Sequence, residues 1–280
     1  MLGMKRRILA AVAMTAGLLV VPVAPAYAFL DTEWVKVFSG SDSNDKTVDA
    51  PCPRGKSTIA GGARISGPGE PYVHLTVLAP MDELGYTATA QEYIGHTALP
   101  WELTTWAVCA KNPSGLEYVS DSTLFSSSTT QQQWAACPRG KRAIGSGATI
   151  AGGNGQVHLV DMRVLEERDT YAQAVETNIG YAFAWSLTAH SICTSDARYV
   201  AWSAGPSTLQ NPKAWVTPCN PQWPPNSVGF HLDGPAGTIG VNDVMVGPAT
   251  YAVTAYQFPS IHPEPWAIEA HTVCVQPTFG

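Results

Sequence analysis

Hydrophobic and polar residues alternate with a period of two just before three of the cysteines. The segments WELTTWAVC, WSLTAHSIC and WAIEAHTVC each begin with a tryptophan and end at a cysteine. A period of two is typical of a half-buried strand. The pattern therefore predicts three equivalent strands with a tryptophan and a cysteine on the core side: Trp101 with Cys109, Trp185 with Cys193 and Trp266 with Cys274.

Further segments rich in β-branched and small residues also predict strands. They include STIAGGARI, YVHLTVLA, YTATAQEY and their counterparts later in the chain. The stretches SGPGEP, AGGNGQ and DGPAG fall between such segments and have the composition of tight turns. No segment has the periodicity of an amphipathic helix, so the sequence predicts an all-β protein of antiparallel strands.

The same landmarks recur three times along the chain. Each copy contains an aromatic–valine pair, a cysteine, a tyrosine, a tryptophan and a second cysteine, in that order and at nearly constant spacing. This periodicity predicts three pseudo-symmetric repeats of about 80 residues each. The repeats are residues 29–117, 118–198 and 199–280, and the tyrosines are Tyr86, Tyr171 and Tyr251.

The length of the repeat limits the possible architectures. A β-trefoil has shorter repeats, and propeller blades of about 40 residues do not fit either. The joints AKNPSGLEYV and CTSDARYV are turns rather than flexible linkers, which favours repeats that pack on one another. Two arrangements remain: a β-prism-like ring of three sheets, or three small sandwiches in contact.

The six cysteines fall two to a repeat, and the two cysteines of each repeat are almost equally far apart. An even number of cysteines in an exported chain indicates disulfides. The constant spacing predicts one bridge per repeat, and bridges between repeats are the alternative. The expected pairs are Cys52–Cys109, Cys137–Cys193 and Cys219–Cys274.

Residues 1–28 have the pattern of a signal peptide. Three basic residues precede an apolar run, and the segment closes on Ala26-Tyr27-Ala28, which a signal peptidase accepts. Pro22 and Pro25 interrupt the apolar run, which disfavours the alternative of a membrane anchor. We therefore expect a secreted, extracellular protein without a membrane span.

Composition narrows the class of partner. The formal net charge is −6, and loss of the leader removes three cations and makes the chain more acidic. Nucleic-acid binding requires a basic face, so we do not expect it. Only 14% of residues are charged, whereas there are nine tryptophans and ten tyrosines, which favours aromatic contacts with a protein or a glycan.

The pattern CPRGK, GGARI, tryptophan and AVCA resembles repeats of secreted actinobacterial proteins of unknown function. The resemblance covers residues 34–280 and implies neither an activity nor particular functional residues. More loosely, three β repeats with internal disulfides resemble the β-prism architecture of vitelline membrane outer layer proteins, although the repeats here are longer.

The turn CPRGK occurs twice and is the first candidate site. Its cations, Arg54 with Lys56 and Arg139 with Lys141, could bind a carboxylate or sulfate of a partner. The alternative is that they only keep an exposed turn soluble. The third repeat has CNPQWPP instead, where Trp223 offers an aromatic contact.

Other residue types give weaker indications of function. His74 and His158 occupy matching places, as do His190 and His271, but no spacing indicates a complete zinc site, so we expect neither metal nor cofactor. Acidic residues at 81–84 and 166–169 are interpreted as solvated loops. No hydrolase motif is present, although a Ser-His-Asp triad could still be assembled from distant positions.

The tryptophans divide into two groups. Trp101, Trp185 and Trp266 follow the repeat and are expected in the core, whereas Trp106, Trp134, Trp202, Trp215 and Trp223 break the threefold pattern. Exposed aromatic residues among polar neighbours suit sugars or protein partners. We single out Trp134 and Trp223 as candidate binding residues.

These observations favour a secreted, non-catalytic binding protein, interpreted first as a protein-binding adaptor in an extracellular assembly. A lectin-like carbohydrate-binding protein is the alternative. An enzyme with an unrecognised site, or an enzyme inhibitor, is the third hypothesis.

Overall fold

The computed structural model describes residues 31–93, 97–111, 113–165, 169–196, 198–220, 222–247, 251–258 and 263–276. The signal peptide expected at residues 1–28 lies outside them. Their regular structure is β-strand, apart from the short 3-10 helices η1 (Glu70–Tyr72) and η2 (Asp82–Leu84). Within these ranges no helix has both the length and the apolar character needed to cross a membrane.

Each repeat contributes six strands, and the first strands of repeats 2 and 3 begin one residue before the boundaries taken from the sequence. Repeat 1 contains β1 (Glu33–Phe38), β2 (Lys46–Pro51), β3 (Ser57–Ser66), β4 (Val73–Pro80), β5 (Gly85–Glu92) and β6 (Glu102–Ala110). Repeat 2 contains β7 (Glu117–Ser122), β8 (Thr130–Ala136), β9 (Arg142–Ala151), β10 (Val157–Val164), β11 (Asp169–Glu176) and β12 (Ser186–Thr194). Repeat 3 contains β13 (Arg198–Ala204), β14 (Lys213–Trp215), β15 (Pro225–Asp233), β16 (Ile239–Val246), β17 (Tyr251–Gln257) and β18 (Ala267–Val275).

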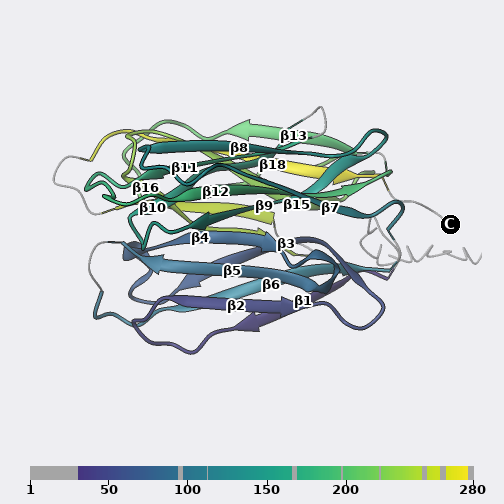
Figure 1. The fold of residues 1–280 in the computed structure, drawn as a ribbon, viewed down its shortest axis with the longest axis horizontal. Coiled ribbons are helices and arrows are strands. Elements are labelled where there is room, and N and C mark those ends of the chain that lie inside the picture. The colour runs from purple at the N-terminus through teal and green to yellow at the C-terminus, as the bar shows by residue number, and fades with distance from the viewer. Residues whose placement is uncertain are drawn as a thin grey trace, which may run out of the picture.

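The strands form three antiparallel sheets, and every sheet is shared between two repeats. Sheet I has the order β2-β5-β4-β9-β12-β7 and joins repeats 1 and 2 (Figure 1). Sheet II, β8-β11-β10-β15-β18-β13, joins repeats 2 and 3, and sheet III, β14-β17-β16-β3-β6-β1, joins repeats 3 and 1. The last repeat therefore pairs with the first, and the three repeats form a closed ring.

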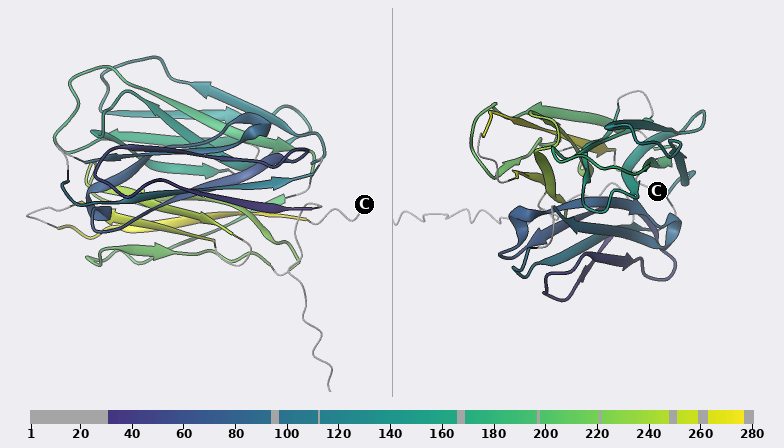
Figure 2. Two further views of the ribbon diagram at one scale, coloured as in Figure 1. Left: turned by 90° about the horizontal axis from the view of Figure 1, so that it is seen from below. Right: turned by 60° about the vertical axis from the view of Figure 1, so that its left-hand side comes forward.

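Within a repeat, the two three-stranded halves pack face to face. The inner faces supply one continuous core that includes residues of all three repeats, and in Figure 2 (right) the repeats lie around a common centre. Trp101, Trp185 and Trp266 are fully buried in this core, as the alternation predicted. The two arrangements left open by the sequence are thus combined, because three small sandwiches are joined edge to edge into a ring of three sheets.

A glycine lies at each seam where two repeats meet. Gly62, Gly147 and Gly229 occupy equivalent places on β3, β9 and β15, the strands that pair with β16, β4 and β10. A Cβ atom added to these glycines would lie 1.9, 2.6 and 2.3 Å, respectively, from a carbonyl oxygen of the neighbouring repeat. Only glycine allows the two backbones to approach this closely. The repeated glycine therefore makes possible the pairing that closes the ring.

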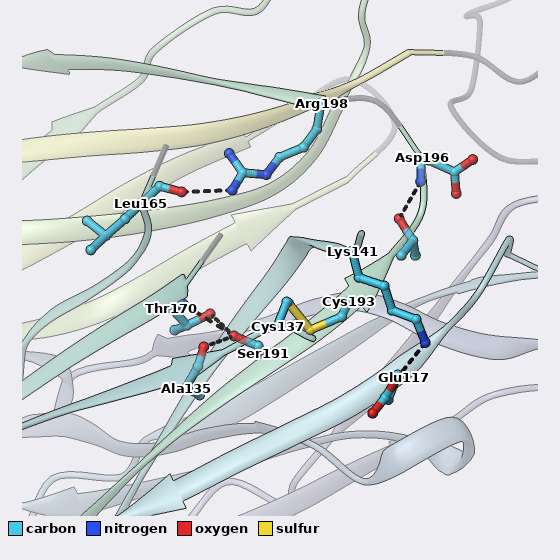
Figure 3. Close-up of a disulfide and its surroundings, with 11 residues drawn as sticks. Glu117, Ala135, Cys137, Lys141, Leu165, Thr170, Ser191, Cys193, Asp196 and Arg198 are labelled. Atoms are coloured by element: carbon cyan, nitrogen blue, oxygen red, sulfur yellow. Dashed lines mark hydrogen bonds and ion pairs between the residues drawn. A yellow bond between two sulfur atoms is a disulfide. The ribbon is translucent and has the colours of Figure 1, made fainter. Parts of the chain in front are cut away.

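The three predicted disulfides are confirmed, one in each repeat. Cys52–Cys109, Cys137–Cys193 and Cys219–Cys274 close loops with sequence separations of 57, 56 and 55 residues. Figure 3 shows the second bridge beside a buried network in which the Ser191 hydroxyl donates to the carbonyl oxygen of Ala135. Disulfides of this kind are typical of an oxidising compartment.

The threefold symmetry breaks at both ends of the central core. At one end Asn226 replaces the isoleucines Ile59 and Ile144 of the other repeats, and its amide donates to both of their carbonyl oxygens. At the other end the rings of His74 and His158 lie 5.4 Å apart, and the ring of Phe258 fills the space beside Gly240. Both histidines are completely buried, which lowers the pKa of His74 to about 4.

Candidate binding face

The two CPRGK turns have an internal structural role. In both, the backbone N–H of the lysine donates to the carbonyl oxygen of the proline, Pro53 or Pro138, and the glycine has a φ of +82°. The Lys56 ammonium pairs with Asp31 and Glu33, and the Lys141 ammonium pairs with Glu117 at the start of β7 (Figure 3). Each lysine therefore links its turn to the first strand of the same repeat.

The two arginines of these turns, Arg54 and Arg139, are exposed and remain candidates for contact with a partner. In the third repeat, the strand pairing places Tyr199 where the first two have Glu33 and Glu117, so the carboxylate that held the lysine is gone. Trp223 instead packs its ring against Tyr199, with the ring centroids 5.4 Å apart. Trp223 thus occupies the place of the ion pair and is only half-buried.

Trp134 lies on β8, on the outer face of sheet II, with 43% of its surface exposed. Its ring is 5.0 Å from that of Tyr171 on β11. Tyr171 itself is one residue out of step with Tyr86, because Thr170 occupies the inward position that corresponds to Tyr86 in the first repeat. This shift of one residue turns Tyr171 outward, since neighbouring residues of a strand point to opposite faces.

Two rows of side chains cross the outer face of sheet II from edge to edge. The pairing of the strands sets neighbouring residues opposite one another. The first row is Trp134, Tyr171, Arg163, Gly229, His271 and Trp202. The second row is Gln132, Gln173, Asp161, His231, Glu269 and Ala204. We call these twelve residues the sheet II face.

An ionic network occupies the middle of the sheet II face. Arg163 contacts the carboxylate of Asp161 at 3.2 Å and that of Glu269 at 3.5 Å. His231 Nδ1 lies 2.8 Å from the buried Asp161 carboxylate, and His271 Nε2 lies 3.2 Å from Glu269. One arginine and two histidines are therefore held between two carboxylates that come from different repeats.

Burial and charge shift the pKa values of this network in different directions. Burial raises the pKa of Asp161, against the lowering effect of His231, and the bond to Asp161 raises the pKa of His231. Burial lowers the pKa of His271. Consequently His231 takes up a proton more readily than His271 as the pH falls, and the charge of the face changes first beside Asp161.

Aromatic rings flank the network at both edges of the sheet. Trp202 on β13 is 58% exposed and stacks on the His271 ring, with the centroids 6.1 Å apart and the planes inclined by 13°. On the other side the Arg163 guanidinium lies 5.8 Å from the centre of the Tyr171 ring. The face thus presents polar groups at its centre and half-exposed indole rings at its two ends.

The same positions carry different residues on the other two sheets. The central pair formed by Asp161 and His231 on sheet II corresponds to Asp243 and Arg64 on sheet III. On sheet I the equivalent positions are held by Val77 and Thr149, which carry no charge. The ionic network with its aromatic ends is therefore specific to sheet II.

Sequence reasoning singled out Trp134 and named Trp202 and His271, but it missed Asp161, Arg163, His231 and Glu269. Asp161 and Arg163 alternate along VHLVDMRV, so the period of two places both on the outer face. Alignment of the repeats could also have shown that Asp161 and Asp243 share a position where the first repeat has Val77. That their partners come from the next repeat could not be foreseen without the shared sheets.

The other candidates lie elsewhere. Among the described residues, no group of three or more potential ligands is placed to hold a metal ion. Asp82 and Glu83 lie exposed in η2, and residues 166–168 of the second acidic loop are outside the described ranges. Trp215 is half-buried, and its indole N–H donates to the Ser203 hydroxyl.

Comparison with known proteins adds no functional assignment. No family model matches the chain, and no curated protein matches it significantly.

Proposed function

We propose that the protein is a secreted, non-catalytic binding protein that recognises a glycan through the sheet II face. The observation that carries the proposal is the pair of half-exposed indoles, Trp134 and Trp202, at the two ends of a polar row. This choice favours the lectin-like hypothesis over the protein adaptor.

The chemistry of the face suits a polyhydroxylated ligand. Indole rings can stack on the apolar faces of sugar rings, because they combine a large hydrophobic surface with a polar edge. Between the indoles, the partly exposed Glu269 accepts hydrogen bonds and Arg163 donates them, which matches hydroxyl groups that do both. The five strand spacings from β8 to β13 separate the indoles by about 24 Å, so a chain of several sugars is needed to contact both.

Two further observations support the proposal: one favours a binding role over a catalytic role, and the other favours secretion of the protein. The charged groups at the centre of the face are engaged with one another, Arg163 lying between Asp161 and Glu269. The three disulfides fit an oxidising environment, which agrees with the leader expected at residues 1–28.

A glycan array probed with the mature chain tests the proposal, followed by calorimetric titration of the best ligand. We expect Trp202→Ala and Trp134→Ala each to weaken binding by about 5-fold or more, as the loss of a stacked ring costs roughly 1 kcal/mol. Phe183→Ala, which removes a ring that is 69% exposed elsewhere, is the matched control and should bind like the wild type. Silence on the array, or binding that is indifferent to both tryptophans, would refute the proposal.

A protein partner remains the second candidate, favoured by a separate observation. Leu124, Phe125 and Phe183 of repeat 2 are exposed by 89%, 64% and 69% and lie near the pairing of Ser126 with Trp185. Exposed apolar residues grouped in this way are typical of protein contacts. Capture of one defined protein from culture supernatant, lost in Phe125→Ser but kept in Trp202→Ala, would establish this candidate.

A further inference from the structure

The seam glycine of sheet III leaves a gap in the outer row of that sheet. The row runs Ala252, Met245, Gly62, Trp106 and Lys36, as the strand pairing sets them side by side. Met245 and Trp106 are two strand spacings apart, about 10 Å between backbones. Because Gly62 has no side chain, the space between the side chains of Met245 and Trp106 has only backbone at its base.

This gap is a pocket of about 360 Å³, lined by Arg64, Trp106, Met245, Val246 and Gly247. The volume lies within the usual range of small-molecule sites, near its lower end. On sheet II the equivalent gap above Gly229 is bridged, since Arg163 and His271 approach to 3.3 Å across it. Met245 and Trp106 stand in the places of those two residues and do not form such a bridge.

One cation, Arg64, lines the pocket, and a second, Lys36, lies one strand beyond Trp106. The Arg64 side chain is 50% exposed, and its only ion pair among the described residues is the 3.7 Å approach of Nε to Asp243. The Lys36 ammonium lies 5.5 Å from the centre of the Trp106 ring and 4.5 Å from that of Phe38. A guanidinium beside an indole ring offers both charge and a flat apolar surface.

Arg64 has two acidic neighbours, Asp243 and Glu70, and burial favours the neutral form of both carboxyl groups. Burial raises the pKa of Asp243 to about 7, and burial also raises the pKa of Glu70. The remaining titratable group facing them is Tyr256 of β17, whose pKa is raised to about 12 by burial and which therefore stays neutral. As the pH falls through 7, the carboxyl group of Asp243 beside Arg64 becomes neutral.

We propose that this pocket binds a small carboxylate attached to a ring, with the carboxylate on Arg64 and the ring against Trp106. Arginine recognises carboxylates through paired N–H donors, and a ring of monosaccharide size fits between Met245 and Trp106. Two sources share this chemistry, an acidic sugar and an aromatic acid. The site lies on a different sheet from the sheet II face and stands whether or not that face binds a glycan.

The affinity of the pocket for a carboxylate ligand depends on the protonation state of Asp243. When ionised, Asp243 competes with the ligand for Arg64, and when protonated it leaves the guanidinium to the ligand. The affinity for a carboxylate therefore falls as the pH rises from about 6 to about 8. Asp243→Asn removes the competitor and makes the affinity independent of pH in this range.

Calorimetric titration of the mature chain with sodium glucuronate and sodium benzoate tests the site, with methyl glucoside as the neutral probe. We expect one or both acids to bind and to shift the indole N–H resonance of Trp106, whereas methyl glucoside does not. Arg64→Gln should weaken binding by about 10-fold or more, because a charged hydrogen bond is lost. Arg142→Gln, a change at an exposed arginine at the start of β9, is the matched control and should bind normally.

Asp243→Asn is a second variant whose expected effect is a gain of affinity, which misfolding would not produce. It should bind the acids at about pH 8 as tightly as the wild type does at about pH 6. Glucuronate alone would identify an acidic sugar as the ligand class, and benzoate alone an aromatic acid. Binding of neither acid, equal binding of methyl glucoside, or binding unchanged in Arg64→Gln would overturn the proposal. Trp202→Ala, which tests the sheet II face, should bind these acids like the wild type, so the two proposals can fail independently.

Discussion

Replacement of Gly62 by alanine tests whether the seams hold the ring together. The new methyl carbon would lie 1.9 Å from the carbonyl oxygen of Val244, a backbone atom that cannot rotate away. Relief of this clash requires β3 and β16 to separate, which disrupts the pairing of repeat 1 with repeat 3. We expect a loss of about 3 kcal/mol in the free energy of unfolding, at the upper end of typical overpacking costs.

Such a loss corresponds to a fall of about 6–12 °C in Tm for a chain of this size. Thermal unfolding followed by circular dichroism measures it, with urea titration as a second readout. Gly40→Ala is the matched control, because no atom lies within 4 Å of the added carbon. Alanine at Gly229 and Gly147 should cost progressively less, since the approach there is 2.3 and 2.6 Å. A Gly62→Ala protein that melts with the Gly40→Ala control would refute the reasoning.

Four further outcomes are expected. Burial lowers the pKa of His74 to about 4, so His74 gains a proton in the unfolded chain before it does in the folded one as the pH drops. The free energy of unfolding should therefore fall between about pH 6.5 and pH 4. His74→Phe should weaken this pH dependence, as measured by urea titrations at several pH values. Asn226→Leu should cost about 1–3 kcal/mol in the same assay, because the buried carbonyl groups of Ile59 and Ile144 lose the amide donor, although that of Ile144 keeps the Ser227 hydroxyl. Joint replacement of Cys137 and Cys193 by serine should cost about 4 kcal/mol, measured against the reduced and oxidised wild type. Lys141→Met should change the free energy of unfolding by less than about 1 kcal/mol, since its partner Glu117 is exposed to solvent by 45%.

Much of the fold could be predicted from the sequence because local rules and the repeat point to the same elements. The period of two in WELTTWAVC placed Trp101 and Cys109 on the core side, and both are fully buried. The constant cysteine spacing identified the three bridges, since a repeated unit keeps its internal distances. These features are set within one repeat and need no knowledge of its neighbours.

The features that were missed arise between repeats. Periodicity indicates that Asp161 faces outward, but not that His231 lies opposite it, because the partner strand belongs to the next copy. The landmark tyrosines are a related case: Tyr171 keeps the spacing of Tyr86 from its cysteine, yet a difference of one residue in register turns it outward. Spacing along the chain therefore located the elements but not the faces on which the candidate sites lie.

The shared sheets also bear on the origin of such a molecule. One copy by itself ends in two half-sheets whose edge strands lack partners, so an ancestral single unit would have needed two identical companions to complete itself, as a homotrimer. In that ancestor every junction had to be the same. A single chain with three copies is free of this constraint, and its three junctions differ, with Arg64 and Asp243 at one, His231 and Asp161 at another, and Thr149 and Val77 at the third.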